Sequence, residues 1–243
     1  LDDVVDGFDP NTAAARLLLA KVDDPTAFGV AELSVEGTIS ALVEKPQQPA
    51  SDLALVGVYL FSPQVHQAVR AIKPSARGEL EITDAIQWLI EHGQVVEHRV
   101  LDGWWIDTGK KDPLLRCNEL LLDKVAPSID GIVDDRSSVD GAVQIGEGAH
   151  VAGSALIGPV IVGGGAQISA STIGPYVSVG AGCRIDGSTV ERTVLMEESR
   201  VVNVGHLTES VLGRHATVNG THNASSEPVS LLLGNHSTID VGQ

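Results

Sequence analysis

The stretch that decides the fold is Val162-Gly-Gly-Gly-Ala-Gln-Ile168, which returns in altered form as Val179-Gly-Ala-Gly-Cys-Arg-Ile185. Each segment has an aliphatic residue at both ends, six positions apart, with small or polar residues between them. The same pattern occurs in five more segments: Val133–Val139, Ile145–Val151, Met196–Val202, Leu212–Val218 and Leu233–Ile239. The starts at 145, 162, 179 and 196 are 17 residues apart, and 212 follows after 16. Such a period predicts one coil of three short sides per repeat, with the aliphatic residues stacked inward. A generic β-sandwich is the alternative.

Before Pro127 the chain alternates predicted strands and helices instead. The expected strands are Leu17–Val22, Val30–Val35, Thr38–Val43, Ala54–Phe61 and Val95–Leu101. Helices are expected to begin at Ser62-Pro63, near Thr83 and at Pro113. This alternation indicates an α/β layer structure. We therefore expect two domains, 1–126 and 127–243, with a loop at Asn219–Pro228 that leaves the last coils.

Charge and cysteine content restrict the partners and the compartment. The 243 residues carry Lys+Arg 16 against Asp+Glu 32, a net charge of −16. A surface this acidic repels phosphate backbones, so nucleic acid is not expected as a partner. No run reaches membrane-spanning length and no signal peptide is visible, so we expect no membrane partner. The two cysteines show no metal or disulfide spacing, which favours a reducing cytoplasm.

Glu44-Lys45-Pro46 ends an expected strand and is a candidate binding motif. The carboxylate could accept hydrogen bonds from sugar hydroxyls while the ammonium pairs with phosphate. A solvated ion pair before a turn is the alternative. Gly57-Val58-Tyr59 lies in another strand, where the glycine permits close approach of a ligand or marks a bulge.

Two further motifs carry charge next to glycine. Arg77-Gly78-Glu79-Leu80-Glu81-Ile82-Thr83-Asp84 precedes a helix; Thr83 or Asp84 could cap it, and Arg77 could reach a phosphate. Trp104-Trp105-Ile106-Asp107-Thr108-Gly109 ends a strand. Asp107 could bind a hard divalent cation that also contacts phosphates, or it could cap the next helix.

In their order along the chain, these residues resemble the sugar nucleotidyltransferase family. The likeness is greatest to the long-form glucose-1-phosphate thymidylyltransferases, which carry a C-terminal hexapeptide-repeat β-helix. The resemblance is carried by five motifs: Phe28-Gly29-Val30, Val43-Glu44-Lys45-Pro46, Gly57-Val58-Tyr59-Leu60-Phe61, Arg77 to Asp84, and Trp105-Ile106-Asp107-Thr108-Gly109. It implies a Rossmann-like nucleotidyltransferase portion followed by a left-handed parallel β-helix. The implied reaction joins glucose 1-phosphate and dTTP to give dTDP-glucose and pyrophosphate, with Mg²⁺.

The resemblance also assigns roles to single residues. Glu44 matches the sugar-binding carboxylate, Lys45 the phosphate-binding lysine and Asp107 one of two metal-binding carboxylates. Gly29 matches a glycine whose backbone contacts the sugar. Gly57 and Tyr59 fall in the sugar-binding segment, and Arg77, with Lys45, is implied to act in catalysis by contacting phosphate. We expect Glu44, Lys45 and Asp107 to converge on one sugar phosphate.

One departure from the family pattern is expected to matter. The glycine-rich G-x-G-T-R-L loop, its lysine and the first metal-binding Asp are absent, and Leu1-Asp2-Asp3 resembles the stretch after that Asp. We therefore expect an N-terminally truncated chain that does not turn over alone.

Two other functions stay open for the repeats. They could only assemble subunits, with a homotrimer favoured. Alternatively, Val204-Gly205-His206-Leu207-Thr208 resembles a segment of bifunctional uridylyltransferases in which the histidine serves acetyl transfer to an amino-sugar phosphate.

Overall fold

The computed structural model describes residues 2–221 and 227–242, and the side chains from residue 4 onward. The central part of the loop expected at Asn219–Pro228, residues 222–226, lies outside the described residues, as does Leu1. Two compact units divide between Trp105 and Ile106. This division lies earlier in the chain than the expected boundary at 126/127, which marks the beginning of the coils. The difference arises because the helix before the coils belongs to the second unit.

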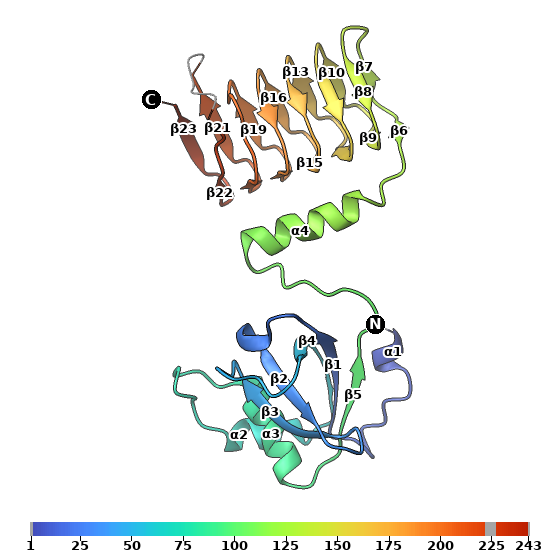
Figure 1. Ribbon diagram of the computed structural model, residues 1–243, viewed down its shortest axis with the longest axis vertical. Helices are drawn as coiled ribbons and strands as arrows, with labels where there is room; N and C mark the ends of the chain where they lie inside the picture. Colours follow the sequence, from blue (N-terminus) through green and yellow to red (C-terminus); the bar gives the residue numbers. More distant parts are fainter. Residues whose placement is uncertain (1, 222–226, 243) are drawn as a thin grey trace. The chain divides into compact units, whose positions relative to one another are not determined.

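The first unit is a five-stranded mixed sheet with helices (Figure 1). The strands are β1 (Ala15–Lys21), β2 (Gly29–Leu33), β3 (Ile39–Glu44), β4 (Leu53–Phe61) and β5 (Val96–Val100). Their order is β3-β2-β4-β1-β5, in which β1 and β5 are parallel and the other neighbours antiparallel. The helical segments are α1 (Asp2–Val5), the 3₁₀ turn η1 (Pro25–Ala27), α2 (Val65–Ala71) and α3 (Ile82–Glu91). The five expected strands are confirmed, with ends shifted by at most two residues, and helices are present in the regions of the first two expected helices.

Apolar residues of the central strands and of α2 and α3 form the core of the first unit. Leu17 and Leu19 of β1 are fully buried, and they pack in one cluster with Ala68 of α2 and with Ile86 and Leu89 of α3. Because Ile86 and Leu89 are three residues apart, they lie on the same face of α3. The two helices therefore fix the sheet whose strand ends carry the candidate site.

The second unit begins with α4 (Lys111–Leu122) and continues as stacked three-sided coils (Figure 1). One side contains β6 (Ser128–Ile129), β9 (Val143–Ile145), β12 (Val160–Val162), β15 (Val177–Val179), β18 (Val194–Leu195), β20 (Val211–Leu212) and β22 (Leu232–Leu233). The next contains β7 (Ile132–Val133), β10 (His150–Ala152), β13 (Gln167–Ser169), β16 (Arg184–Asp186), β19 (Arg200–Val202), β21 (Thr217–Gly220) and β23 (Thr238–Val241). The third contains β8 (Ser138–Asp140), β11 (Ala155–Ile157), β14 (Thr172–Ile173) and β17 (Thr189–Val190).

All pairs within these three sheets are parallel, which is consistent with the expected left-handed β-helix. Aliphatic residues point inward in columns, as in Val162, Val179 and Leu195, which are aligned in register and almost fully buried. A period of three sides per coil brings each inward residue above its counterpart in the next coil, so the core is continuous.

The expected phase of the Met196–Val202 segment is wrong by one residue. Leu195, not Met196, pairs with Val179, and Val201, not Val202, pairs with Ile185. The coil is one residue shorter between Val190 and Val194 than its predecessor, because Ile173 pairs with Val190 and Ser178 with Val194. The 16-residue step therefore falls one coil earlier than the sequence pattern indicates.

Two expected helix starts are also wrong. The helix expected from Ser62-Pro63 begins at Val65, because the Ser62 hydroxyl bonds with the Ala14 carbonyl oxygen and the Gln64 side chain. The helix expected from Pro113 begins at Lys111. Proline is compatible with the first turn, where backbone N–H groups have no partner within the helix.

Candidate active site

Gly29 forms the floor of the candidate site at the beginning of β2. It is buried and pairs with Glu44, the last residue of β3. A Cβ added at Gly29 would lie 2.5 Å from Thr83 Cγ2, 2.8 Å from Leu55 Cδ1 and 3.2 Å from Glu44 Oε2. Only glycine therefore allows the β2–β3 strand ends to meet the beginning of α3 this closely.

Glu44 is the centre of the site and has three partners. Its Oε2 accepts a hydrogen bond from Thr83 Oγ1 at 3.1 Å. Its Oε1 lies 3.5 Å from Arg77 Nη1 and 3.7 Å from Lys45 Nζ. The Glu44 side chain is 21% exposed, against 45% for Lys45 and 40% for Arg77. One carboxylate with an accessible face is thus held beside two cations that face solvent.

Thr83 does not cap α3, and neither does Asp84. Glu81 occupies the N-cap position without a side-chain capping bond, and the helix begins at Ile82. Thr83 is buried and turns its hydroxyl to Glu44 instead. The sequence predicts Thr83 only as a helix cap and does not predict its contact with Glu44. Thr83 does belong to the motif from Arg77 to Asp84, which is the one signal that could have indicated it.

Arg77 lies in a turn before α3 and is held by carboxylates. Its guanidinium bonds with Glu79, and its Nε lies 3.5 Å from Glu81 Oε1. Ser75 supports this turn, because its hydroxyl bonds with Glu81 Oε1 at 2.9 Å. The hydrogen bond from Arg77 lowers the pKa of Glu79, and the same bond raises the pKa of Arg77. The guanidinium is therefore positively charged and fixed in orientation.

Tyr59 and Gly57 lie in β4. Burial, followed by the negative charge of Glu44, raises the pKa of the Tyr59 phenol, so the neutral hydroxyl persists near the site. Gly57 is in a β-bulge: Leu17 of β1 pairs with Tyr59, whereas Leu19 pairs with Leu55. Its φ of +80° requires glycine, and a Cβ there would meet nothing within 4 Å. The bulge interpretation explains Gly57 fully, and a sugar-binding role for it stays a prediction.

Asp107 belongs to the second unit, whereas Glu44, Lys45 and Arg77 belong to the first. Its Oδ1 accepts a hydrogen bond from the Gly109 amide at 3.0 Å, and it does not cap α4, whose N-cap is Lys110. Within the described residues, no group of three His, Cys, Asp or Glu side chains could hold a metal ion. The convergence of Asp107 with Glu44 on one phosphate therefore stays a prediction.

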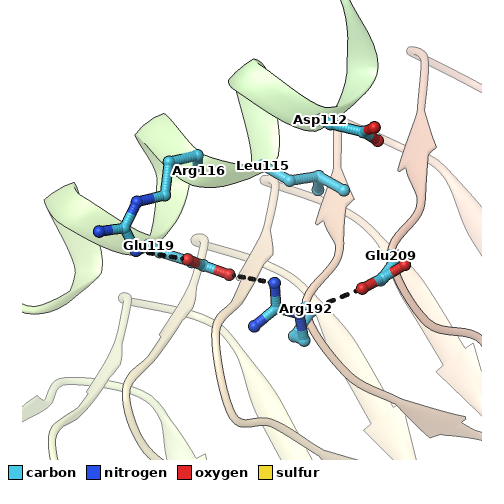
Figure 2. Close-up of a pocket in the computed structure, with 6 residues that line it drawn as sticks. All are labelled: Asp112, Leu115, Arg116, Glu119, Arg192 and Glu209. Carbon is cyan, nitrogen blue, oxygen red and sulfur yellow. Dashed lines mark hydrogen bonds and ion pairs between the residues drawn. The ribbon is translucent and has the colours of Figure 1, made fainter. Parts of the chain in front are cut away.

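A second charged cluster joins α4 to the coils (Figure 2). Buried Glu119 of α4 lies between two arginines, with its Oε2 2.9 Å from Arg116 Nη1 and its Oε1 2.7 Å from Arg192 Nη2. Arg192 Nε is also 3.6 Å from Glu209 Oε1. Arg192 lies at the corner where the coil is one residue shorter. Because each charge already has a partner, this hollow attaches the helix and does not offer an unpaired charge to a ligand.

His206 also has a carboxylate partner in the coils. Its Nε2 lies 3.2 Å from Glu191 Oε2, and its side chain is largely buried. A carboxylate can orient an imidazole for proton transfer. Acetyl transfer by His206 nevertheless stays a prediction, as does a purely structural role of the coils. Within the described residues, no helix is long and apolar enough to cross a bilayer.

The chain is similar in sequence to known proteins over nearly its whole length. Residues 1–124 match the nucleotidyl transferase family. The chain is 46% identical to a glucose-1-phosphate thymidylyltransferase of Streptomyces antibioticus over 99% of this chain and 68% of that protein. It is 43% identical to the enzyme of the same name from Streptomyces griseus, with the same coverage. It is 38% identical to the low-salt glycan biosynthesis nucleotidyltransferase Agl11 of Haloferax volcanii, over 98% of this chain and 67% of that protein.

These matches extend across both units, so they include the coils as well as the sheet that carries Glu44. Identity above 40% over this length shows a shared fold. The chain therefore belongs to the nucleotidyl transferase family.

Proposed function

We propose that the protein transfers a nucleotidyl group to a sugar 1-phosphate, with glucose 1-phosphate and dTTP as substrates and dTDP-glucose and pyrophosphate as products. The observation that carries this proposal is the cluster of Glu44, Lys45, Arg77 and Thr83 above Gly29. The names of the two Streptomyces relatives support the choice of glucose 1-phosphate and the thymidylyl group.

Glu44 would bind the sugar part of the substrate, and the two cations would bind its phosphate. The carboxylate accepts hydrogen bonds from sugar hydroxyls, while Lys45 and Arg77 neutralise the phosphate. Lys45 has a φ of +42°, and the other non-glycine residues with positive φ in the described chain all lie in the coils. Backbone strain of this kind persists where the surroundings enforce it, and it is concentrated at functional sites.

In the proposed reaction an oxygen of the sugar phosphate attacks the α-phosphorus of dTTP. A new P–O bond forms, the bond to the bridging oxygen breaks, and pyrophosphate leaves with that electron pair. The step depends on positioning and on charge neutralisation more than on covalent catalysis. Lys45 and Arg77 would hold the attacking phosphate, and Glu44 would keep the sugar in one orientation.

Members of this family generally use a divalent metal ion, and we propose Mg²⁺ with Asp107 as a ligand. Mg²⁺ is usually bound by one or two carboxylates together with substrate phosphates, so a single hard oxygen ligand fits this ion. When bound, it would neutralise charge on the phosphate groups.

The test is a binding experiment that separates the sugar contact from the phosphate contact. We expect Glu44→Gln to weaken the binding of glucose 1-phosphate about tenfold, because the sugar hydroxyls then donate to a neutral amide in place of a charged carboxylate. Inorganic phosphate should bind Glu44→Gln at least as well as wild type. Lys45→Met should weaken the binding of both glucose 1-phosphate and inorganic phosphate. Isothermal titration calorimetry measures these affinities.

Matched controls are Glu36→Gln and Lys73→Met, which change exposed residues of the first unit. They should bind both ligands like wild type. Equal affinity of wild type and Glu44→Gln for glucose 1-phosphate would contradict the assignment of Glu44. Absence of glucose 1-phosphate binding to the wild-type chain would contradict the proposed substrate.

We also propose that the protein is a homo-oligomer, with a trimer favoured, through the flat sides of the coils. Exposed apolar residues on these sides support this proposal, among them Ile132 and Ile157. Analytical ultracentrifugation measures the mass, and a monomer at micromolar concentration would contradict it. We propose a reducing cytoplasm as the compartment, since Cys117 and Cys183 are both free thiols.

A further inference from the structure

The loop that carries Asp107 continues directly into α4 (Figure 1), and side chains of α4 contact the coils (Figure 2). Leu115 and Leu122 are buried, and Glu119 is paired with Arg192. Asn118 receives a hydrogen bond from Ser178 Oγ at 2.6 Å. Apolar burial and polar contacts together hold the helix in one place on the coils.

The first residue of α4 has its own contact with a distant coil. Lys111 Nζ donates to Ser230 Oγ at 2.7 Å, across 119 residues of sequence. The Ser230 hydroxyl in turn donates to the Glu209 carbonyl oxygen at 3.0 Å. The Lys111 side chain is only 26% exposed. This two-bond chain fixes the end of the helix that is nearest to Asp107.

The loop residues between Asp107 and Lys111 also face the coils. Thr108, Gly109 and Lys110 line a hollow of about 300 Å³ together with coil residues. The coil residues include Met196 and Val211. The loop therefore lies against the coils, and Asp107 Oδ1 is oriented within it by the Gly109 amide.

We propose that the β-helix is a positioning element for nucleotidyl transfer, with Lys111 and Ser230 as positioning residues that hold the Asp107 loop. This inference rests on the proposed function, because it gives Asp107 its role as a metal ligand. The ammonium–hydroxyl bond lies four residues from Asp107, at the beginning of a helix that Glu119–Arg192 and Asn118–Ser178 also hold on the coils. A catalytic carboxylate must be held to a fraction of an ångström, and rigid elements do this better than free loops.

The first measurement is amide hydrogen exchange in the peptide that contains residues 106–110, followed by mass spectrometry. In Ser230→Ala we expect exchange in this loop to increase about fivefold, because the helix end loses its hydrogen bond from Lys111 to the coils. Ser230→Thr keeps the hydroxyl and should restore slow exchange. Ser237→Ala is the matched control, since in the described structure the Ser237 side chain makes no hydrogen bond.

The second measurement is Mn²⁺ binding in the presence of glucose 1-phosphate, followed by electron paramagnetic resonance. Affinity should fall about fivefold in Ser230→Ala and recover in Ser230→Thr. Asp107→Asn should bind Mn²⁺ more weakly still. Exchange in the core strands of the coils, such as β14, should stay as in wild type in all variants.

The two measurements separate the positioning role from the proposed function. Unchanged loop exchange in Ser230→Ala would overturn the positioning role. Faster exchange throughout the coils would also overturn it, because Ser230 would then be a general structural residue. Equal Mn²⁺ affinity of Asp107→Asn and wild type would overturn the metal role of Asp107, while the loop exchange still decides the anchoring.

Discussion

At the scale of single residues, the site depends on one carboxylate whose partners come from separate segments of the chain. Glu44 ends β3, Thr83 lies in the first turn of α3, and Arg77 lies in the preceding turn. Each partner restricts the rotation of the Glu44 side chain. The carboxylate is therefore preorganised for hydroxyl groups before any ligand arrives.

Gly29→Ala should destabilise the first unit by about 1–3 kcal/mol, the usual cost of overpacking. The added Cβ would lie 2.5 Å from Thr83 Cγ2 and 2.8 Å from Leu55 Cδ1, so these side chains or the elements that carry them must shift. Urea unfolding measures the loss. Gly234→Ala is the control, because its Cβ would meet only Ser237 Oγ at 3.9 Å. Equal stability of Gly29→Ala and wild type would show that the site has room for a methyl group.

Asp134 gives the coils a pH-dependent contribution to stability. A hydrogen bond from Ser137 Oγ at 2.5 Å, then one from the Gly153 amide at 3.0 Å, lowers its pKa to about 2. Since the folded pKa is below the unfolded one, the carboxylate stabilises the fold fully above about pH 4. This stabilisation is lost as the pH falls toward about 2.

Asp134→Asn should therefore be less stable than wild type at pH 7, and the difference should shrink between about pH 4 and about pH 2. Thermal unfolding of both proteins across this range measures the difference. Asp135→Asn, one residue away, serves as the control for the loss of one carboxylate in this segment. A difference that is constant across this range would mean that the Asp134 charge does not contribute.

At the scale of elements, a column of serines connects successive coils at one corner. The Ser171 hydroxyl accepts a hydrogen bond from the Ser188 amide at 3.1 Å and donates to the Ser169 carbonyl oxygen at 2.6 Å. Ser154 has the same relation to Ser171, with a distance of 3.0 Å. The hydroxyls thus satisfy buried amides that the strand ladders do not reach.

Ser171→Ala should cost about 1–3 kcal/mol, because the buried Ser188 amide is left without an acceptor. Chemical denaturation monitored by circular dichroism at strand wavelengths reports on the coils. Ser237→Ala removes a hydroxyl that has no hydrogen-bond partner in the described structure and should change stability little. Comparable midpoints for the two variants would argue against a stabilising role of the serine column.

The elements show how far sequence reasoning extends. The repeat predicts the coils because inward aliphatic residues must recur once per side. It misplaces Met196 because apolar residues stand at both 195 and 196 and at both 201 and 202, so the sequence pattern fits either phase. The motifs indicate Glu44, Lys45 and Arg77, but not Thr83, whose hydroxyl is aimed by tertiary packing. Lys111–Ser230 and Glu119–Arg192 have no sequence signal, since their partners are far apart in the chain.

At the scale of the whole molecule, there are two separate hydrophobic cores. Leu17 belongs to the core of the sheet and Ile173 to that of the coils, and both are fully buried. Each core is continuous within its own unit, and the units divide between Trp105 and Ile106. Stability is therefore a property of each unit.

Leu17→Ala and Ile173→Ala should each lower one of two unfolding transitions. A cavity in either core costs about 2–5 kcal/mol, and the core of the other unit is unaffected. Differential scanning calorimetry resolves the transitions, and the wild-type trace provides both reference midpoints. A single transition lowered equally by both substitutions would show that the units unfold as one.

The continuous core of the coils has a practical consequence for labelling. Cys183 is fully buried in this core, and burial raises the pKa of its thiol, so neutral reagents find little thiolate there. The half-buried Cys117, on α4, is then the preferred target for a maleimide dye or a nitroxide. Wild-type protein would thus accept one spectroscopic probe on α4 without any engineered cysteine. After labelling of the folded protein, a proteolytic digest should contain one labelled peptide, the one with Cys117.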